Sequence, residues 1–511
     1  MTGRGDTTIS RDELRHATLA SVRWVTVVRV VAETIGLAST VVLARLLTPA
    51  EFGRAALTLI LFEIAYSLAN EGFGTPLVQR AAIDARHVRT AVTMALAFGA
   101  ALSAGAALLT LVVVPPLFGA GVVGLFLISA PVFLIAGPGA VAQSVLAREM
   151  DFRRLGAIEV VSLVVNIAST VVLALAGLGA AALVLGRLLQ ALVTVCGQVR
   201  VARLPLPGWD ARAAREIGGF GTTSAGAGLL WALTRNIDYT IVGAKLGAVQ
   251  AGFYWRAFNL AVEYQGRITA IMQRVALPIY SRAESIADMR ALRFRVVRAH
   301  SAAIIPLLAL IGAIAPTLVP WLYGPSWEPA VVPTQLLALA GVTYPVSAGL
   351  GALILAAGLP GTLMAANLIQ LVLYVAMLLV LAPHGLVAVC IGVVAVAYAQ
   401  TLAVHWFVLD RRVGIPIADV WRDVRPALAS SAALIVAASA TRATLDNAGA
   451  GPAIVVVSAA AAGGLAYLAV MRGAFAGAWA DLVLLARAVL ARTSRGVGAQ
   501  PATRDPEAVR P

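Results

Sequence analysis

Charged residues are scarce in this sequence. Asp, Glu, Lys and Arg make up 13% of the 511 residues, about half the share that is usual in soluble domains. Hydrophobic residues make up 60%, and many apolar stretches reach the ~20 residues that a helix needs to cross a bilayer. These stretches lack the polar–apolar alternation of transmembrane β-strands. The composition therefore predicts an all-α polytopic membrane protein.

Motifs that would indicate other classes of protein are absent from the sequence. The two cysteines, Cys196 and Cys390, both lie in apolar stretches, which favours neither a disulfide framework nor a zinc site. No Walker lysine motif for ATP binding occurs. The outer loops are short and carry no paired carboxylates, which argues against a membrane glycosyltransferase or a glycan polymerase. We expect no cofactor, no metal and no catalytic residue.

Fourteen apolar stretches are candidate transmembrane helices. The loops between them are short, so none has room for a soluble domain. Residues 1–22 are a polar tail, and the apolar stretch after it is a retained first span and not a cleaved signal peptide. The expected spans are residues 23–45, 53–75, 91–114, 119–146, 156–177, 179–199, 216–244, 250–274, 300–323, 330–357, 361–382, 385–409, 426–444 and 452–471.

Basic residues are distributed unequally between the two sides of the membrane. Arginine supplies nearly all of them, since Lys245 is the only lysine in a chain of net charge +14. With a cytoplasmic N-terminus, the inner segments carry thirty arginines, and the outer loops carry four basic residues, Arg45, Arg54, Lys245 and Arg442. This asymmetry follows the positive-inside rule and predicts that both termini are cytoplasmic. Because the positive charge follows the loops, it does not indicate a nucleic-acid partner.

Two similar segments indicate an internal repeat. "RLLTPAEFGRA" (45–55) and "KLGAVQAGFYWRA" (245–257) each close a hairpin, and aligning Gly53 with Gly252 gives an offset of 199 residues, or six spans. An even number of spans gives both copies the same orientation, which predicts two parallel six-helix lobes related by an axis along the membrane normal. The expected parts are an N-lobe at 23–205, a C-lobe at 206–410, a two-helix appendage at 411–471 and a cytoplasmic tail at 472–511.

Charged residues inside the spans are the candidate site. Each costs several kcal/mol at mid-bilayer, on the order of the insertion penalties for charged residues, and most belong to the first helical pair of each lobe. The candidate substrate-binding residues are Arg29, Arg235, Arg256, Arg267 and Asn236. The candidates for ion coupling, or for charge partners of these arginines, are Glu33, Glu63, Asp238 and Glu263.

The spacing of these residues predicts a polar cavity. Arg256, Glu263 and Arg267 share one helical face, and Arg235 and Asp238 are three residues apart on another helix. Their positions along the spans place arginines at two levels, which suits a phosphate or pyrophosphate that passes between them, since guanidinium groups bind phosphate in a forked geometry. The alternative is a set of internal salt bridges that only fix helix packing.

Four segments carry a resemblance to a known family. "NIDYTIVGAKLGAVQAGFYWRAFNLA" (236–261) resembles the central segment of Wzx-type polysaccharide flippases, a branch of the multidrug/oligosaccharidyl-lipid/polysaccharide superfamily. "ARLLTPAEFG" (44–53), "GFGTPLVQR" (72–80) and "REMDFRRLGAIE" (148–159) resemble further stretches of the same family, in the same order. The resemblance covers nearly the whole chain and implies a V-shaped fold of two lobes, with a cavity lined by spans 1, 2, 7 and 8.

The resemblance also implies a function. Such a protein moves an undecaprenyl-pyrophosphate-linked oligosaccharide from the cytoplasmic to the outer leaflet of the bacterial plasma membrane, for export of capsule, exopolysaccharide or cell-wall glycan. The implied partners are this lipid-linked substrate, membrane lipids, and a polysaccharide polymerase with its export machinery. A lipid II-type flippase and a multidrug cation antiporter of the same superfamily are the alternatives. The 236–261 pattern favours the polysaccharide branch, and the cavity arginines and two extra spans argue against the antiporter.

Overall fold

The computed structural model describes residues 35–36, 38–80, 82–263, 280, 285–480 and 483. This part of the chain contains helices and no strand. Eleven helical stretches are long and apolar enough to cross a membrane, namely Pro49–Gln79, Ala85–Phe118, Ala120–Arg148, Phe152–Leu175, Ala180–Ala202, Ile286–Tyr323, Pro325–Ala356, Pro360–His384, Leu386–Val413, Ile417–Asn447 and Pro452–Ala474. They coincide with the second to sixth and the ninth to fourteenth expected spans, so the prediction of an all-α polytopic membrane protein is confirmed.

The other three expected spans differ from these eleven. The first and the eighth lie partly outside the described residues. The seventh is covered by α9 (Ala211–Leu246), a continuous helix of 36 residues. Helix α9 is less apolar than the eleven because glycine, serine and threonine fill much of its first half.

The chain divides into two compact units. The first comprises Met1–Phe258, Val319–Pro333 and Leu371–Gly392, and the second comprises Asn259–Leu318, Thr334–Gln370 and Val393–Pro511. The longer helices of the first unit are α2 (Pro49–Ala69), α4 (Ala85–Phe118), α6 (Val132–Arg148), α7 (Phe152–Leu175), α8 (Ala180–Ala202), α9 and α10 (Ala248–Phe258), with α3 (Thr75–Gln79), α5 (Val123–Ser129) and the π-helix η1 (Asn70–Gly74) between them.

The 3-10 helix η4 (Pro325–Ala330) also lies in the first unit. The other helices lie in the second unit or contribute to both. They are the π-helix η3 (Asn259–Glu263), α12 (Ile286–Tyr323), α13 (Val331–Gly341), α14 (Thr343–Val346), α15 (Leu350–Ala356), α16 (Pro360–Leu381), α17 (Leu386–Val404), the π-helix η6 (His405–Val413), α18 (Ile417–Asn447) and α19 (Pro452–Ala474).

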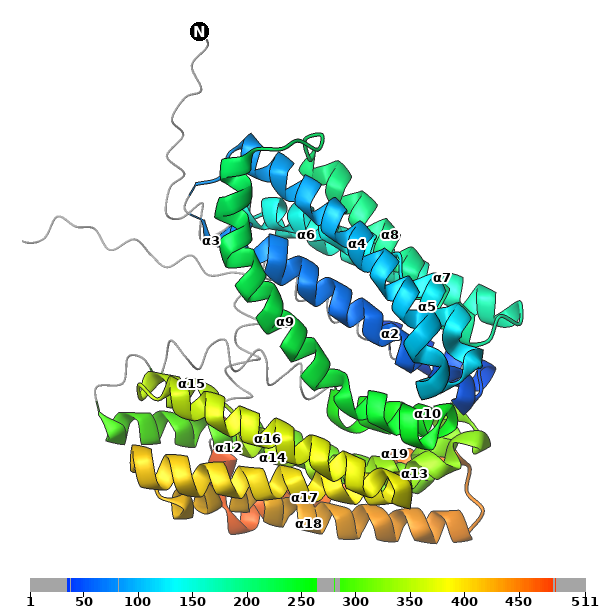
Figure 1. Ribbon diagram of the computed structural model, residues 1–511. Coiled ribbons are helices and arrows are strands. Elements are labelled where there is room, and N and C mark those ends of the chain that lie inside the picture. The colour runs from blue at the N-terminus through cyan, green and yellow to red at the C-terminus, as the bar shows by residue number, and fades with distance from the viewer. Residues whose placement is uncertain are drawn as a thin grey trace, which may run out of the picture. The chain divides into compact units, whose positions relative to one another are not determined.

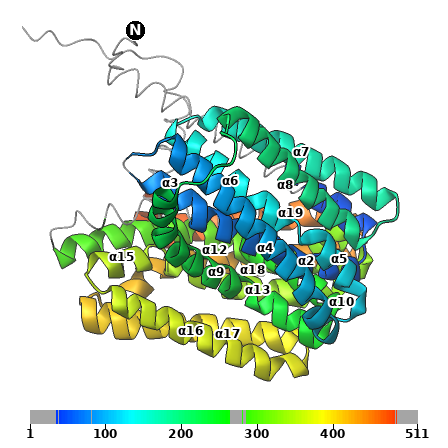
Figure 2. The same cartoon turned by 45° about the horizontal axis from the view of Figure 1, so that its top comes forward.

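In the first unit, small and apolar side chains join neighbouring helices. Helix α6 packs against α4 and α8, α7 pairs with α8, and α2 packs against α9 and α10 (Figure 1). Phe62 of α2, Val132 and Phe133 of α6 and Ala191 of α8 are buried in one shared core. Within the same unit, Gly392 of α17 lies against Met377 of α16, and these two helices run side by side (Figure 2).

The start of α2 explains the "TPAE" segment of the first repeat. Thr48 is the N-cap, its hydroxyl oxygen accepts a 3.3 Å hydrogen bond from the backbone N–H of Glu51, and the Glu51 carboxylate accepts a 2.7 Å bond from the backbone N–H of Thr48. This is a complete capping box. Pro49 occupies the first helical position, where a missing N–H costs nothing. The motif therefore fixes the residue at which α2 begins.

Two loops of the first unit end in aspartate caps. Asp84 accepts hydrogen bonds from the first turn of α4, and Asp210 accepts them from the first turn of α9. The Arg86 guanidinium beside Asp84 holds the pKa of that carboxyl well below its usual range. A backbone hydrogen bond from Ala213 lowers the pKa of Asp210. Both caps therefore keep their negative charge at neutral pH, which stabilises the positive N-terminal ends of these helices.

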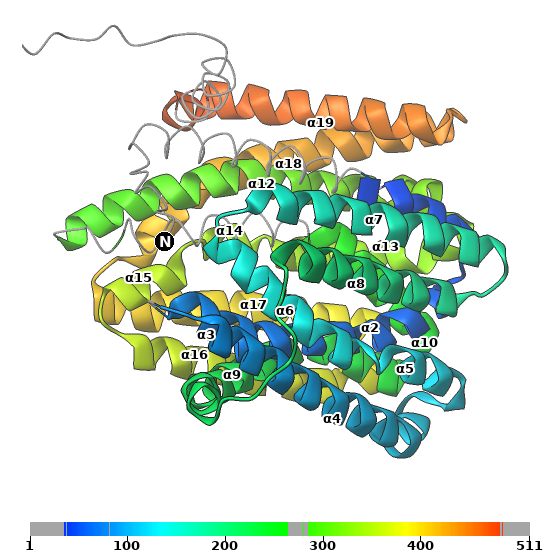
Figure 3. The same ribbon diagram turned by 90° about the horizontal axis from the view of Figure 1, so that it is seen from above.

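In the second unit, α18 and α19 form an antiparallel pair (Figure 3). The Tyr467 hydroxyl of α19 donates a 3.0 Å hydrogen bond to the backbone carbonyl of Ala302 in α12. Ion pairs described below join α12 to α18. The two C-terminal spans are therefore bonded to the ninth span within this unit.

Candidate functional site

Helix α9 carries three of the expected site residues. Arg235 is exposed, and its guanidinium carbon lies 5.5 Å from the ring centroid of Trp231, which is 55% exposed. Asn236 is buried, and its side-chain amide donates a 2.8 Å hydrogen bond to the carbonyl of Ala232 one turn earlier. Of these site residues, Arg235 therefore has an exposed charge, and Asn236 is bonded back to its own helix.

Asp238 is buried at 3% exposure and is bonded to tyrosines. Its carboxylate accepts a 2.8 Å hydrogen bond from the Tyr254 hydroxyl of α10 and a 3.3 Å bond from the Tyr374 hydroxyl of α16. Its other oxygen accepts the backbone N–H of Tyr239 at 2.9 Å. The partners of Asp238 are thus neutral donors and not Arg235, although the two residues are three positions apart. Sequence spacing could not foresee this, because Tyr374 is 136 residues away.

Arg256 of α10 is enclosed by aromatic rings. It is 3% exposed, and its guanidinium carbon lies 4.2 Å from the ring centroid of Phe52, 5.1 Å from that of Tyr323 and 5.6 Å from that of Trp327. The Trp327 indole N–H donates a 3.0 Å hydrogen bond to the carbonyl of Ala44. Cation–π attraction to several rings offsets the cost of removing the Arg256 guanidinium from water. The same rings join α2, α10 and the segment 319–333.

The ends of α2 and α10 cross at two glycines. A Cβ on Gly53 would lie 2.8 Å from the backbone nitrogen of Gly252 and would overlap the carbonyl oxygen of Ala248. A Cβ on Gly252 would lie 3.1 Å from the nitrogen of Gly53 and would overlap the carbonyl oxygen of Pro49. Only glycine permits this approach of the two backbones. These are the residues that the repeat alignment places at equivalent positions.

A second contact between α2 and α9 was missed by the sequence analysis. The Ser67 hydroxyl donates a 2.7 Å hydrogen bond to the carbonyl of Gly228, and the Ser224 hydroxyl donates a 2.9 Å bond to the carboxylate of Glu71. A Cβ on Gly228 would lie 2.8 Å from side-chain atoms of Ser67 and Glu71. The available signal was the row of small residues at 221, 224, 225 and 228 on one face of α9.

The other expected site residues are placed as follows. Glu63 is exposed on α2, and Glu263 is half-buried at the end of η3, in the second unit. Arg29, Glu33 and Arg267 lie outside the described residues.

The second unit contains a buried ion pair that the sequence analysis assigned to loops. Arg293 of α12 and Asp423 of α18 have side chains only 3% and 2% exposed, and their N–O distance is 3.2 Å. A second nitrogen of Arg293 lies 3.3 Å from Nε2 of His405. Both helices begin well before their expected spans, at residues 286 and 417. The expected boundaries followed hydropathy, and these first helical turns are too polar to be included.

The second unit also contains a pocket whose described lining carries no charged residue. Its cavity volume is about 580 Å³. Polar lining groups of this neutral pocket include Asn367, Gln370, Gln400 and Tyr344. Amides and hydroxyls inside apolar helices are costly unless they are bonded to a partner, and they are the groups that hydrogen-bond sugar hydroxyls. None of these residues was among the site residues predicted from the sequence.

The fold and its many apolar helices define a multi-pass helical membrane protein. The family described as "Polysaccharide biosynthesis protein" matches residues 42–332, more than half of the chain. The protein belongs to this family, and with its many apolar helices it is a multi-pass protein of the bacterial plasma membrane.

Three curated proteins are similar in sequence. "Lipopolysaccharide biosynthesis protein WzxC" of Escherichia coli (strain K12) is 24% identical over 349 residues, 67% of this chain and 70% of that protein. "Uncharacterized membrane protein in cps region" of Klebsiella pneumoniae is 25% identical over 414 residues, 80% and 85% of the two chains. "Teichuronic acid biosynthesis protein TuaB" of Bacillus subtilis (strain 168) is 26% identical over 298 residues, 56% and 60%.

Two solved structures show the same fold. The lipid II flippase MurJ in an inward closed conformation aligns with a TM-score of 0.71 and 13% identity, over 87% of this chain and 97% of that chain. An inward-facing multidrug resistance transporter of the MATE family aligns with a TM-score of 0.55 and 16% identity, over 76% and 93%. The predicted membership of the superfamily, and of its polysaccharide branch, is confirmed.

Proposed function

We propose that the protein is a flippase that moves an undecaprenyl-pyrophosphate-linked oligosaccharide from the cytoplasmic to the outer leaflet of the plasma membrane. The match to the polysaccharide biosynthesis family over residues 42–332 carries this proposal. Relatives named for lipopolysaccharide and teichuronic acid biosynthesis support it. The glycan would be exported as capsule, exopolysaccharide or cell-wall material, with a polymerase and its export machinery as partners.

The proposed architecture has fourteen spans and two cytoplasmic termini. An N-lobe at 23–205 and a C-lobe at 206–410 are followed by the two-helix appendage at 411–471. The asymmetry of arginine between alternate loops supports the orientation. The reciprocal contact of Gly53 and Gly252 supports the repeat, because a two-fold relation exchanges the two halves of that contact.

The proposed roles of the site residues follow from their surroundings. Arg235 is exposed and takes the pyrophosphate, to which a guanidinium can donate two parallel hydrogen bonds. Arg256 is buried among aromatic rings, so its contribution includes joining α10 to α2. The neutral pocket, with Asn367, Gln370 and Gln400, is a site for sugar hydroxyls. Arg29 and Arg267 remain proposed headgroup contacts.

The flippase moves its substrate between leaflets without making or breaking a covalent bond, so it is not an enzyme. The polar headgroup crosses through the lobes while the polyprenyl tail stays in the bilayer. Glu33, Glu63, Asp238 and Glu263 are proposed as ion-coupling groups or charge partners. Asp238 is the candidate that is buried in the described part of the chain, and its described side-chain donors are neutral tyrosine hydroxyls.

Lipid II transport and drug export are the alternative functions. The likeness to MurJ and to the MATE transporter concerns the fold, at 13% and 16% identity. The family match and the curated relatives favour a polysaccharide substrate over both.

The test is a deletion strain that is complemented with wild-type protein, with Arg235→Ala or with Arg153→Ala. Arg153 is an exposed arginine at the start of α7 and serves as the matched control. We expect lipid-linked glycan to accumulate in the inner leaflet of the deletion strain and of the Arg235→Ala strain, with normal export for Arg153→Ala. Normal glycan export in the deletion strain, accompanied by drug sensitivity, would instead establish the antiporter.

A further inference from the structure

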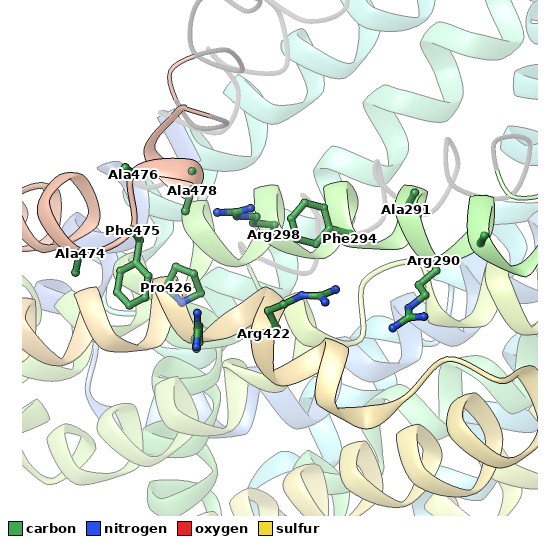
Figure 4. A pocket seen from close by; sticks show the side chains of 13 residues that line it. Arg290, Ala291, Phe294, Arg298, Arg422, Pro426, Ala474, Phe475, Ala476 and Ala478 are labelled. Atoms are coloured by element: carbon green, nitrogen blue, oxygen red, sulfur yellow. The ribbon is translucent and has the colours of Figure 1, made fainter.

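The second unit contains a pocket lined by four arginines (Figure 4). Arg290 and Arg298 come from α12, and Arg422 and Arg425 come from α18. The chain that follows α19, residues 474–478, forms the remaining wall. The cavity volume is about 690 Å³, which is within the range of small-ligand sites. Three segments that are far apart in the sequence thus build one concave, basic surface.

Aromatic and acidic side chains hold the arginines in place. The ring of Phe294 lies between two of them, with its centroid 5.0 Å from the guanidinium carbon of Arg298 and 5.9 Å from that of Arg422. Asp419 is bonded to Arg290, and it lies 3.2 Å from Arg422. These contacts fix guanidinium groups in advance, so less side-chain entropy is lost when a ligand binds.

The described lining of the pocket is basic. Asp419 and Asp423 are only 5% and 2% exposed, and no acidic side chain is among the described lining residues. Asp423 is the partner of the buried Arg293. The described lining therefore presents four guanidinium groups and no carboxylate. Arg290 and Arg422 keep exposed side chains, at 44% and 55%.

The location of the pocket favours a lipid headgroup as its ligand. It lies where α12 and α18 begin and α19 ends, on the side that the arginine-rich loops assign to the cytoplasm. Trp421 precedes the lining residue Arg422 in the chain and is 63% exposed, and tryptophan is enriched at the interface of the bilayer. Basic pockets between helices at this level bind the phosphates of anionic lipids.

We propose that this pocket binds the phosphate of a lipid headgroup in the cytoplasmic leaflet. The four guanidinium groups donate to the phosphate oxygens, and the alanines, Phe294 and Phe475 contact the apolar part of the lipid. The site is separate from the charged residues of α9 and α10, and it does not depend on which glycan is transported.

The test uses the full-length protein purified in detergent and native mass spectrometry with four probes: phosphatidylglycerol, phosphatidylcholine, undecaprenyl phosphate and inorganic phosphate. The variant is Arg298→Gln/Arg425→Gln, which leaves the Asp419 ion pairs intact. The matched control is Arg295→Gln, an exposed arginine of α12 outside the lining. We expect the double variant to bind phosphatidylglycerol or undecaprenyl phosphate about 30-fold more weakly than wild type, since it removes two interfacial arginines that contribute about 1 kcal/mol each. The control should bind normally.

Three outcomes would overturn the proposal. The first is equal binding of phosphatidylglycerol and phosphatidylcholine together with no binding of undecaprenyl phosphate. The second is an equal loss of binding in the Arg295→Gln control. The third is binding of inorganic phosphate that is as strong as that of phosphatidylglycerol or undecaprenyl phosphate. The last outcome would identify a site for a free anion. An unchanged unfolding temperature in the double variant shows that a loss of binding is not a loss of fold.

Discussion

Gly53 and Gly252 pack against each other, and they occupy equivalent positions in the two repeats. The contact is reciprocal, because Gly53 meets the carbonyl of Ala248 and Gly252 meets the carbonyl of Pro49, and these two partners are also 199 residues apart. The repeat is not symmetric in chemistry. Leu57, the counterpart of Arg256, packs on Gly243 in an apolar contact, whereas Arg256 needs aromatic rings around it.

Substituting either glycine of this crossing should destabilise the protein by a similar amount. We expect Gly53→Ala and Gly252→Ala each to cost about 1–3 kcal/mol, because the new methyl group must displace backbone and not a flexible side chain. The measurement is the apparent unfolding temperature in detergent. Gly105→Ala is the control, since a Cβ there meets nothing within 4 Å. A large effect at one glycine and none at the other would contradict the reciprocal contact.

The crossing of α9 and α2 should respond to glycine substitution in the same way. Gly228→Ala places a methyl group 2.8 Å from side-chain atoms of Ser67 and Glu71, while Gly226→Ala meets nothing within 4 Å. We expect Gly228→Ala to lower the unfolding temperature and to reduce glycan export, and Gly226→Ala to do neither. Equal behaviour of these two variants, which are two residues apart on one helix, would show that the close approach of Gly228 to Ser67 and Glu71 does not matter.

Substitutions of Arg235 and Arg256 should have different effects on the stability of the protein. We expect Arg235→Ala to abolish glycan export with an unchanged unfolding temperature, because its side chain is exposed. Arg256→Ala should also lower the unfolding temperature, by loss of a desolvated cation–π contact that is worth about 2 kcal/mol. Export assays and thermal unfolding of the same preparations provide the comparison. Loss of stability in Arg235→Ala would contradict its proposed role as a headgroup contact.

The hydrogen bond from Tyr254 to Asp238 should contribute more to stability than the bond from Tyr374. We expect Tyr254→Phe to destabilise the protein by about 1–3 kcal/mol, because it removes the shorter hydrogen bond to a buried acceptor. Tyr374→Phe should cost less, since its bond is 3.3 Å long. A double-mutant cycle with Asp238→Asn measures each coupling. If Asp238 carries an ion, Asp238→Asn should also block export in a folded protein.

Substitutions of polar residues in the neutral pocket should reduce transport without destabilising the protein. We expect Asn367→Leu and Gln370→Leu each to reduce export several-fold, because a lost hydrogen bond to a sugar costs on the order of 1 kcal/mol. Unfolding temperatures should remain at the wild-type value or rise. The control is Met364→Leu on the same helix, where the side chain is 72% exposed and outside the pocket. Normal export in both polar variants would remove the pocket from the transport path.

The sequence predicted the membrane class and most of the helices because these depend on local composition. The eleven apolar helices coincide with expected spans, and the "TPAE" capping box lies where the first repeat was identified. The family also followed from local motifs. By contrast, Asp423 and Arg293 were assigned to loops, since their helices begin in polar turns that hydropathy does not recognise.

The sequence by itself determined that the chain is a helical membrane protein, which loops are basic, and which rare charges lie in apolar helices, because each of these depends on residues that are near one another in the chain. Only the tertiary structure decided what those charges touch. Asp238 is bonded to a tyrosine 136 residues away, and Arg256 is enclosed by Phe52 and Trp327 from other segments. Such partners are brought together by helix packing, and spacing along one helix does not contain that information.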